Sequence, residues 1–209
     1  MDDAGAHRQS EEHAFVGRGG LKLQHALDTF KLDVRGFSCA DFGCNIGGFT
    51  DCLLQAGAAH VYAVDTGYGA LAWKLRNDSR VTVMERTNAL HAPAPEGGVD
   101  LVVIDLAWTP QRLAVPAALG WLKDDEGARI ITLIKPHYEA EKLGMGDRLR
   151  DGVLDESDAE TAAQRVIDEA PAYGAEAIGV TRSPIVGGAG KRSKKAGGNA
   201  EWLGLMRRM

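Results

Sequence analysis

The spacing of hydrophobic residues changes along the chain, and each change predicts a different element. An amphipathic helix entered through Gly19-Gly20 is indicated by apolar residues at i, i+3, i+4 and i+7, namely Leu23, Ala26, Leu27 and Phe30. Further helices are expected around Phe49 to Ala56 and around Ala162 to Ala170. Residues 1–14 lack such a pattern, so we expect a flexible tail there.

Short apolar runs alternate with helix-sized segments through most of the chain. Runs of Val, Ile and Leu without polar alternation fit strands of a parallel sheet covered on both faces. The expected strands are Phe37 to Phe42, Val61 to Val64, Val81 to Met84, Leu101 to Ile104, Ile130 to Ile134, Ala175 to Thr181 and Trp202 to Met206. This order predicts a doubly wound α/β fold, mostly parallel with an antiparallel last strand. No linker divides the pattern, so we expect a single domain over residues 15–209.

Composition narrows the class of protein. A chain of 209 residues with 44% hydrophobic and 25% charged residues fits one globular domain. The three cysteines, Cys39, Cys44 and Cys52, have no zinc-site spacing, so we expect reduced thiols and no metal site. No run reaches the roughly 18 apolar residues of a membrane span, and Met1-Asp2-Asp3 is acidic. These features predict a cytoplasmic protein with no membrane partner; they predict no oligomeric state.

Charge is distributed unevenly along the chain. The formal net charge is -5, yet from Arg182 to Met209 seven basic residues face one acidic residue, Glu201. A basic strip in this region could contact RNA phosphates through Lys191, Arg192, Lys194 and Lys195. A solvated loop explains the strip equally well when it is considered alone.

A glycine-rich segment follows the first expected strand, where ligands of open α/β sheets bind. Its spacing, Gly43-x-x-x-Gly47-Gly48, differs from the Gly-x-Gly-x-x-Gly of pyrophosphate-binding loops. Asp65, 22 residues after Gly43, can reach a ribose hydroxyl, and Thr87-Asn88 can flank an adenine. Taken alone, the glycines are more simply explained as turn residues and Asp65 as a helix cap. Together they favour a nucleoside-containing cofactor, with these candidate residues: Asp41, Gly43, Cys44, Asn45, Gly47, Gly48, Phe49, Thr50, Asp65, Thr87, Asn88 and Asp105.

Charged residues close two of the apolar strands. Asp105 follows Leu101 to Ile104 and Lys135 follows Ile130 to Ile134, so a parallel sheet brings both to one edge. Lys22, at the first helix, and Glu201, before an antiparallel last strand, could join them. The alternative for Asp105 and Lys135 is a structural ion pair or solvent-facing strand ends. For Lys22 and Glu201 it is surface charge.

Several motifs resemble one known family. They are Arg18 to Leu23, Asp41 to Gln55, Tyr62 to Asp65, Trp73 to Arg76, Glu85 to Asn88 and Lys135 to Glu139. These segments resemble the TlyA haemolysin-like branch of the FtsJ (RrmJ-type) RNA ribose methyltransferases. The resemblance implies a Rossmann-like class I methyltransferase sheet, S-adenosylmethionine as cofactor, and ribosomal RNA as the default partner. It also implies a Lys-Asp-Lys-Glu tetrad at Lys22, Asp105, Lys135 and Glu201, and it adds Arg18 to the RNA-binding candidates.

In this reading Lys135 activates the ribose 2′-hydroxyl, either as a neutral base or as a cation that stabilises the developing alkoxide. The sequence departs from the branch in three places. Leu106 to Thr109 stands where a Ser-Phe pair is common, Cys44-Asn45 replaces a smaller pair, and only Met1 to Ala14 stands where an RNA-binding domain usually precedes. Three alternatives remain: a small-molecule O-methyltransferase, a non-catalytic RNA-binding haemolysin-like module, and, disfavoured by the glycine spacing, an NAD-dependent oxidoreductase.

Overall fold

A computed structural model describes residues 14–187 and 198–209 of the chain. In this part, one sheet of seven strands has the order β3-β2-β1-β4-β5-β7-β6. The strands are β1 (Ser38–Phe42), β2 (His60–Val64), β3 (Val81–Met84), β4 (Leu101–Ile104), β5 (Arg129–Ile134), β6 (Ala175–Arg182) and β7 (Trp202–Arg208). Each lies within two residues of the bounds that the apolar runs predict.

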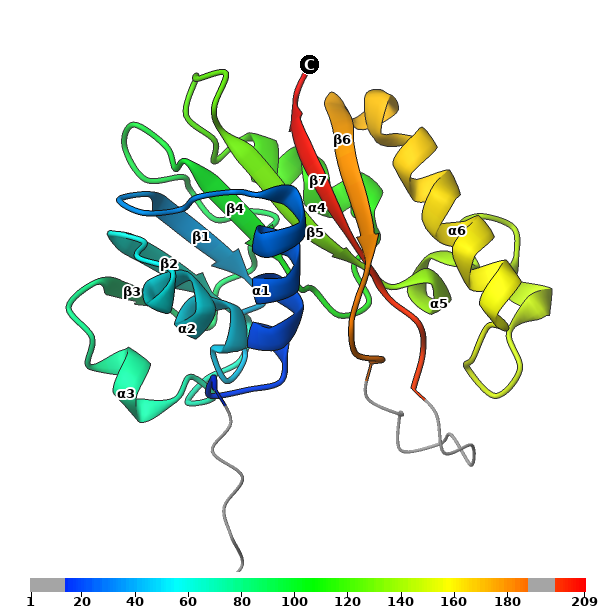
Figure 1. The fold of residues 1–209 in the computed structure, drawn as a ribbon, viewed down its shortest axis with the longest axis horizontal. Coiled ribbons are helices and arrows are strands. Elements are labelled where there is room, and N and C mark those ends of the chain that lie inside the picture. The colour runs from blue at the N-terminus through cyan, green and yellow to red at the C-terminus, as the bar shows by residue number, and fades with distance from the viewer. Residues whose placement is uncertain (1–13, 188–197) are drawn as a thin grey trace, which may run out of the picture.

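The strand directions confirm the predicted topology. Strands β1 to β5 pair in parallel, whereas β7 is antiparallel to β5, with Ile134 opposite Trp202. The edge strand β6 pairs antiparallel with β7. Figure 1 shows β7 (red) running toward the C-terminal end, against the direction of β5. The start of β7 therefore lies at the edge where β1 to β5 end, which we call the carboxyl edge.

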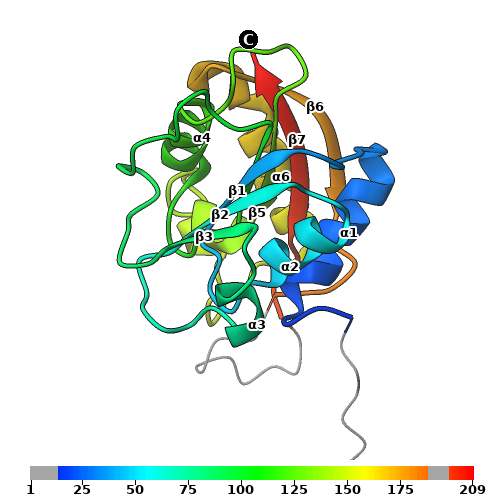
Figure 2. The same ribbon diagram turned by 90° about the vertical axis from the view of Figure 1, so that its left-hand side faces the viewer.

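Helices cover both faces of the sheet (Figures 1 and 2). They are α1 (Gly19–Phe30), α2 (Gly48–Gln55), α3 (Trp73–Arg76), α4 (Gln111–Leu119), α5 (Pro136–Glu139) and α6 (Glu156–Asp168), with short 3-10 turns at Gly146–Arg148 and Ala170–Tyr173. Alternate strand residues belong to different hydrophobic clusters: Leu101 and Val103 pack with α1 and α2, and Val102 and Ile104 pack with α4. A third cluster packs α6 against the last residue of β5, Ile134, and the first residue of β7, Trp202. Burial on both faces explains why the central strands β4 and β5 read as uninterrupted apolar runs.

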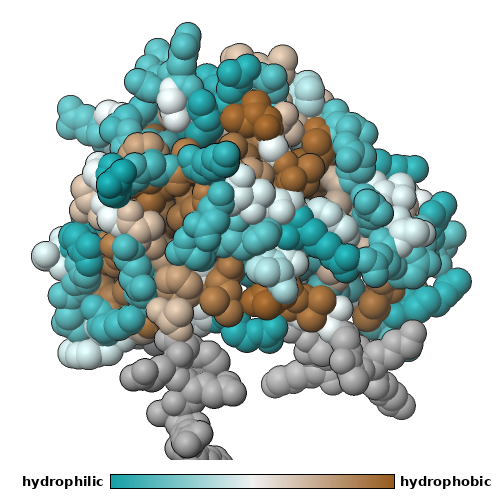
Figure 3. All heavy atoms as spheres, viewed as in Figure 1, coloured by the Kyte–Doolittle hydropathy of each residue, from teal (hydrophilic) through white to brown (hydrophobic). Residues whose placement is uncertain are grey.

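The face of the molecule drawn in Figure 3 is predominantly polar. Figure 3 shows hydrophobic side chains in several separate patches among hydrophilic ones on one face. Within the described residues, no helix combines the length and apolar character that a bilayer crossing requires.

Candidate functional site

Strand register determines which side chains meet at the carboxyl edge. Phe42 of β1 lies opposite both Val64 of β2 and Ile104 of β4, so the residues that follow these strands, Gly43, Asp65 and Asp105, lie side by side. The pairing of Ile134 with Trp202 likewise makes Lys135 and Glu201 backbone neighbours. Charged residues next to four strands, β2, β4, β5 and β7, thus gather along one edge of the sheet, beside the turn glycine that follows β1.

Gly43 makes the first turn after β1 possible. Its φ is +89°, and a Cβ added to it would lie 2.5 Å from the carbonyl oxygen of Asp105. The amides of Gly43 and Cys44 donate to the carbonyl oxygen of Val64 over 2.8 and 3.2 Å. The backbone between β1 and α2 therefore passes very close to its neighbours, and any larger residue at position 43 would displace it.

The rest of the glycine-rich segment packs α2 against α1. Gly47 precedes α2 with a φ of +100°, and a Cβ on Gly48 would meet the amide nitrogen of Gly20 at 3.0 Å. Cys44 and Phe49 are buried in the hydrophobic cluster beneath. Four predicted cofactor residues thus do not line the cavity and instead pack the turn against the core and α1. They are Cys44, Gly47, Gly48 and Phe49.

Asp41 is a fully buried acid beneath the same turn. Its Oδ2 accepts from the amide and the hydroxyl of Thr50, over 2.9 and 2.7 Å. Among the residues that the structure describes, its other oxygen has no hydrogen-bond partner. Burial raises the pKa of Asp41 to about 7, and the nearby Asp105 carboxylate adds to this rise. A buried oxygen without a donor is an incomplete site, since such groups are normally satisfied.

Asp65 organises the neighbouring loops. Its carboxylate accepts from the amides of Asn45 and Gly67, over 2.8 and 2.7 Å, and its carbonyl oxygen accepts from the amide of Thr87 at 2.9 Å. The Oδ1 atom of Asn88 accepts from the amide of Leu90 at 3.0 Å, which closes the next turn. These bonds hold the loops after β1, β2 and β3 together.

A cavity of about 520 Å³ opens between these loops. Seven predicted site residues line it: Gly43, Asn45, Asp65, Thr87, Asn88, Asp105 and Lys135. Sequence reasoning did not assign cofactor contacts to the other lining residues, Val64, Thr66, Ala89, Leu90, Leu106, Ala107, Trp108 and Thr109. The only sequence feature that could have identified them is their position, since each lies within a few residues of a predicted contact.

Two ion pairs lie at the carboxyl edge. The Nζ of Lys135 lies 2.6 Å from an Asp105 oxygen and donates to the carbonyl oxygen of Leu106 at 3.3 Å. Lys22 pairs with Glu201, and the exposed fractions of their side chains are only 11% and 4%. Burial raises the pKa of Glu201, and the cations Lys22 and Lys135 oppose that rise. The four residues predicted as a tetrad thus form two adjacent acid-base pairs.

The predicted RNA-binding residues are placed only in part. Arg18 lies exposed at the start of α1 and donates to the carbonyl oxygen of Val186 at 3.2 Å. Lys191, Arg192, Lys194 and Lys195 lie outside the described residues. Among the residues that are described, no group of three or more His, Cys, Asp or Glu side chains is arranged to hold a metal ion.

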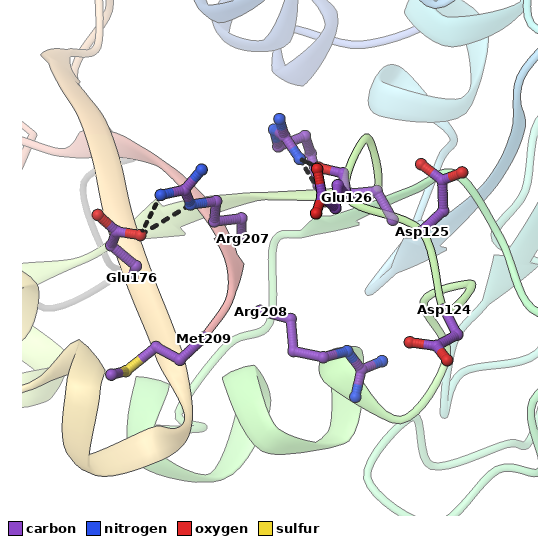
Figure 4. Close-up of a pocket in the computed structure, with 9 residues that line it drawn as sticks. Asp124, Asp125, Glu126, Glu176, Arg207, Arg208 and Met209 are labelled. Atoms are coloured by element: carbon purple, nitrogen blue, oxygen red, sulfur yellow. Dashed lines mark hydrogen bonds and ion pairs between the residues drawn. The ribbon is translucent and has the colours of Figure 1, made fainter.

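A second cavity, of about 640 Å³, lies at the opposite edge of the sheet (Figure 4). Arg129 at the start of β5 and Arg207 and Arg208 at the end of β7 contribute to it. It is separated from Lys135 by the six residues of β5, or about 20 Å. Arg207 pairs with Glu176 at 2.6 Å, and Arg208 donates to the carbonyl oxygen of Leu119 at 2.8 Å. Because ligands of parallel sheets bind at the carboxyl ends of the strands, we assign the candidate site to the cavity of about 520 Å³ at the carboxyl edge.

Comparison with known proteins finds a matching family model and several relatives. The family model described as FtsJ-like methyltransferase matches residues 15–193. The 16S/23S rRNA (cytidine-2'-O)-methyltransferase TlyA of Mycobacterium tuberculosis is 44% identical over 183 residues. These residues cover 86% of this chain and 66% of that relative, so the chain spans just under two thirds of its length.

Solved structures agree on the fold. A hemolysin-like protein of Streptococcus thermophilus has 36% identity and a TM-score of 0.83, covering 96% of this chain and 70% of that chain. An S-adenosylmethionine dependent methyltransferase from Mesorhizobium loti has 16% identity and a TM-score of 0.57, covering 92% of this chain and 100% of that chain. At such low identity the second likeness concerns the fold alone, which is the predicted Rossmann-like methyltransferase sheet.

Proposed function

The chain belongs to the FtsJ-like methyltransferase family, and on this basis we propose that it transfers a methyl group from S-adenosylmethionine to a ribose 2′-hydroxyl of RNA. The observation that supports this function best is the pairing of Lys135 with Asp105 in the lining of the cavity, next to the buried pair of Lys22 with Glu201. Acid and base groups beside a cavity are what an alcohol needs to become a nucleophile.

The cavity fits a nucleoside cofactor. The left-handed turn at Gly43 leaves no room for a side chain, so a ligand there would contact bare backbone. The Oδ1 of Asp41, which has no hydrogen-bond partner among the described residues, is a buried carboxyl oxygen close beneath that turn. Asp65 would bind the ribose hydroxyls, and Thr87 and Asn88, which also line the cavity, would flank the adenine. Asn45 and Asp105 also line the cavity, whereas Cys44, Gly47, Gly48 and Phe49 would fix the conformation of the turn from the side away from it.

When bound, S-adenosylmethionine supplies an electrophilic methyl group on a sulfonium sulfur. A ribose hydroxyl beside that group would be the nucleophile, and its proton would have to leave or be shared. Lys135, on the cavity wall, would either take that proton as a neutral base or, as a cation, stabilise the developing alkoxide. Alignment of oxygen, carbon and sulfur by the cavity would supply much of the remaining acceleration.

The other three residues would orient Lys135. Asp105 lies 2.6 Å from the Lys135 ammonium and fixes its direction. Glu201 is a backbone neighbour of Lys135 and is itself held by Lys22. The negative charges of Asp105 and Glu201 would offset two lysines in a partly buried site, which costs less than burying either cation alone.

Ribosomal RNA is the proposed substrate. The relative TlyA is named for methylation of cytidine 2′-oxygens in 16S and 23S rRNA, and this chain is 44% identical to it over 183 residues. Arg18 and the strip Lys191, Arg192, Lys194 and Lys195 would bind phosphates without reading sequence. A ribosomal substrate would also place the protein in the cytoplasm.

Incubation with labelled S-adenosylmethionine and purified ribosomal subunits, followed by mapping of 2′-O-methylated positions, tests this function. We expect stoichiometric methylation of a specific rRNA ribose. Methyl transfer to small alcohols but not to RNA would favour the small-molecule alternative. RNA binding without any transfer would favour the non-catalytic alternative.

A further inference from the structure

Two segments face each other along one side of the cavity. The first is the loop from Asp105 to Pro110, which joins β4 to α4 and supplies five of the cavity-lining residues. The second runs from Lys135 through α5 to Glu139. Lys135 holds the start of the loop through its bonds to Asp105 and the carbonyl oxygen of Leu106.

A separate contact holds the other end of the loop. The amide of Gln111, the first residue of α4, donates to a carboxylate oxygen of Glu139 over 2.9 Å. Both residues are buried, at 4% and 5% exposure. Pro110, which precedes the helix, offers no side-chain cap, so Glu139 supplies the cap from a different helix. Both ends of the loop are therefore anchored to the same short segment, Lys135 to Glu139.

Gln111 also reaches the strand that carries Lys135. Its side-chain oxygen accepts from the hydroxyl of Thr132 at 2.6 Å, and its side-chain amide donates to the carbonyl oxygen of Leu133 at 3.3 Å. Thr132 is fully buried. The end of the loop is thus held against β5 at positions two and three residues before Lys135.

Between the two anchors the loop adopts an unfavourable conformation. Trp108 has a φ of +62°, and its side chain is 80% exposed at the cavity. Its ring lies 4.5 Å from the ring of Tyr138 in the second segment. A non-glycine residue in this region of φ persists only where the surroundings enforce it. The anchors at Lys135 and Glu139 are those surroundings.

We propose that Glu139 is a positioning residue for methyl transfer, which anchors the Gln111 amide and so holds the loop carrying Trp108 against Lys135 at the cavity. This inference rests on the proposed function, and it adds a residue that acts through the loop and touches neither cofactor nor RNA. The Glu139 carboxylate acts as a hydrogen-bond acceptor, so a neutral acceptor of the same shape can replace it.

The first test measures the anchor itself. Hydrogen exchange of the Asp105 to Gln111 amides, followed by mass spectrometry on the full chain, should accelerate in Glu139→Ala and stay at the wild-type rate in Glu139→Gln. Unchanged exchange in a folded Glu139→Ala protein would overturn the proposal. Because this measurement requires no substrate, it is independent of the proposed activity.

The second test measures the consequence for transfer to RNA. Misplacement of a reacting group by about 1 Å can cost on the order of 10²-fold in rate. We expect Glu139→Ala to lower kcat on that scale with a much smaller change in the Kd for S-adenosylmethionine, and Glu139→Gln to restore most of the rate. Equal loss in both variants would contradict the acceptor mechanism. If the wild-type protein transfers no methyl to RNA, the proposed function fails and this inference fails with it.

Two controls separate positioning from general destabilisation. Asp155 caps α6 by accepting the Asp158 amide at 2.9 Å, away from the cavity, so Asp155→Ala removes the same kind of contact and should leave kcat unchanged. If Glu139 acts through Trp108, the variants Glu139→Ala and Trp108→Ala should be non-additive, with the double variant about as slow as the slower single one. Additive losses would overturn the proposal.

Discussion

Lys22 and Glu201 lie 179 positions apart in the chain, yet they form a buried ion pair that ties the start of α1 to the start of β7. Removing one partner of a buried pair leaves an uncompensated group, which typically costs about 3–5 kcal/mol. We expect Lys22→Met to lower the free energy of unfolding on that scale in urea denaturation. The double variant Lys22→Met/Glu201→Leu should recover part of the loss. A single variant as stable as wild type would show that the pair is not effectively buried.

Asp41 predicts a pH dependence of stability. Burial raises its pKa from 3.8 to about 7, so the folded state holds a proton that the unfolded state releases. Stability contributed by this proton is fully present below about pH 4 and is lost as the pH rises through 7, at about 1.4 kcal/mol per pH unit. Unfolding of wild type and Asp41→Asn, measured across this range, should show the difference between them changing with pH. Parallel curves would contradict the burial of this acid.

Asp65 should contribute directly to cofactor affinity. It lines the cavity, and its carboxylate also holds the Asn45 amide. Hydrogen bonds to charged groups are worth about 1.5–3 kcal/mol, so Asp65→Ala should weaken S-adenosylmethionine binding about 10- to 100-fold by calorimetry. An unchanged Kd would exclude the proposed ribose contact.

The basic strip should contribute sequence-independent RNA affinity. Replacing Lys191, Arg192, Lys194 and Lys195 by Gln should weaken RNA binding and reduce the slope of log K against log salt by about 0.7 for each lost phosphate contact. Lys123→Gln is a suitable control, because Lys123 pairs with Asp100 near the start of β4, away from the carboxyl edge. If the strip variant kept the wild-type slope, these residues would form only a solvated loop.

The sequence predicted most of the sheet because apolar runs such as Leu101 to Ile104 are buried on both faces and leave little ambiguity. It also predicted that Asp105 and Lys135 meet, since both follow strands of one parallel sheet. It did not predict that Glu139 caps α4 or that one oxygen of Asp41 lacks a donor, because both depend on contacts between segments distant in sequence. The four-residue helix α3 was missed because a single turn has no periodicity to detect.

Lys135→Ala tests the central claim most directly. Its side chain lies on the cavity wall and pairs with Asp105, so its loss should remove the activation of the ribose hydroxyl. The loops after β1, β2 and β3, which Asp65 holds together, should stay in place. Folded Lys135→Ala protein should bind S-adenosylmethionine by calorimetry, and its transfer of labelled methyl to RNA should fall by about 10²-fold or more. Transfer at the wild-type rate by this variant would contradict the account.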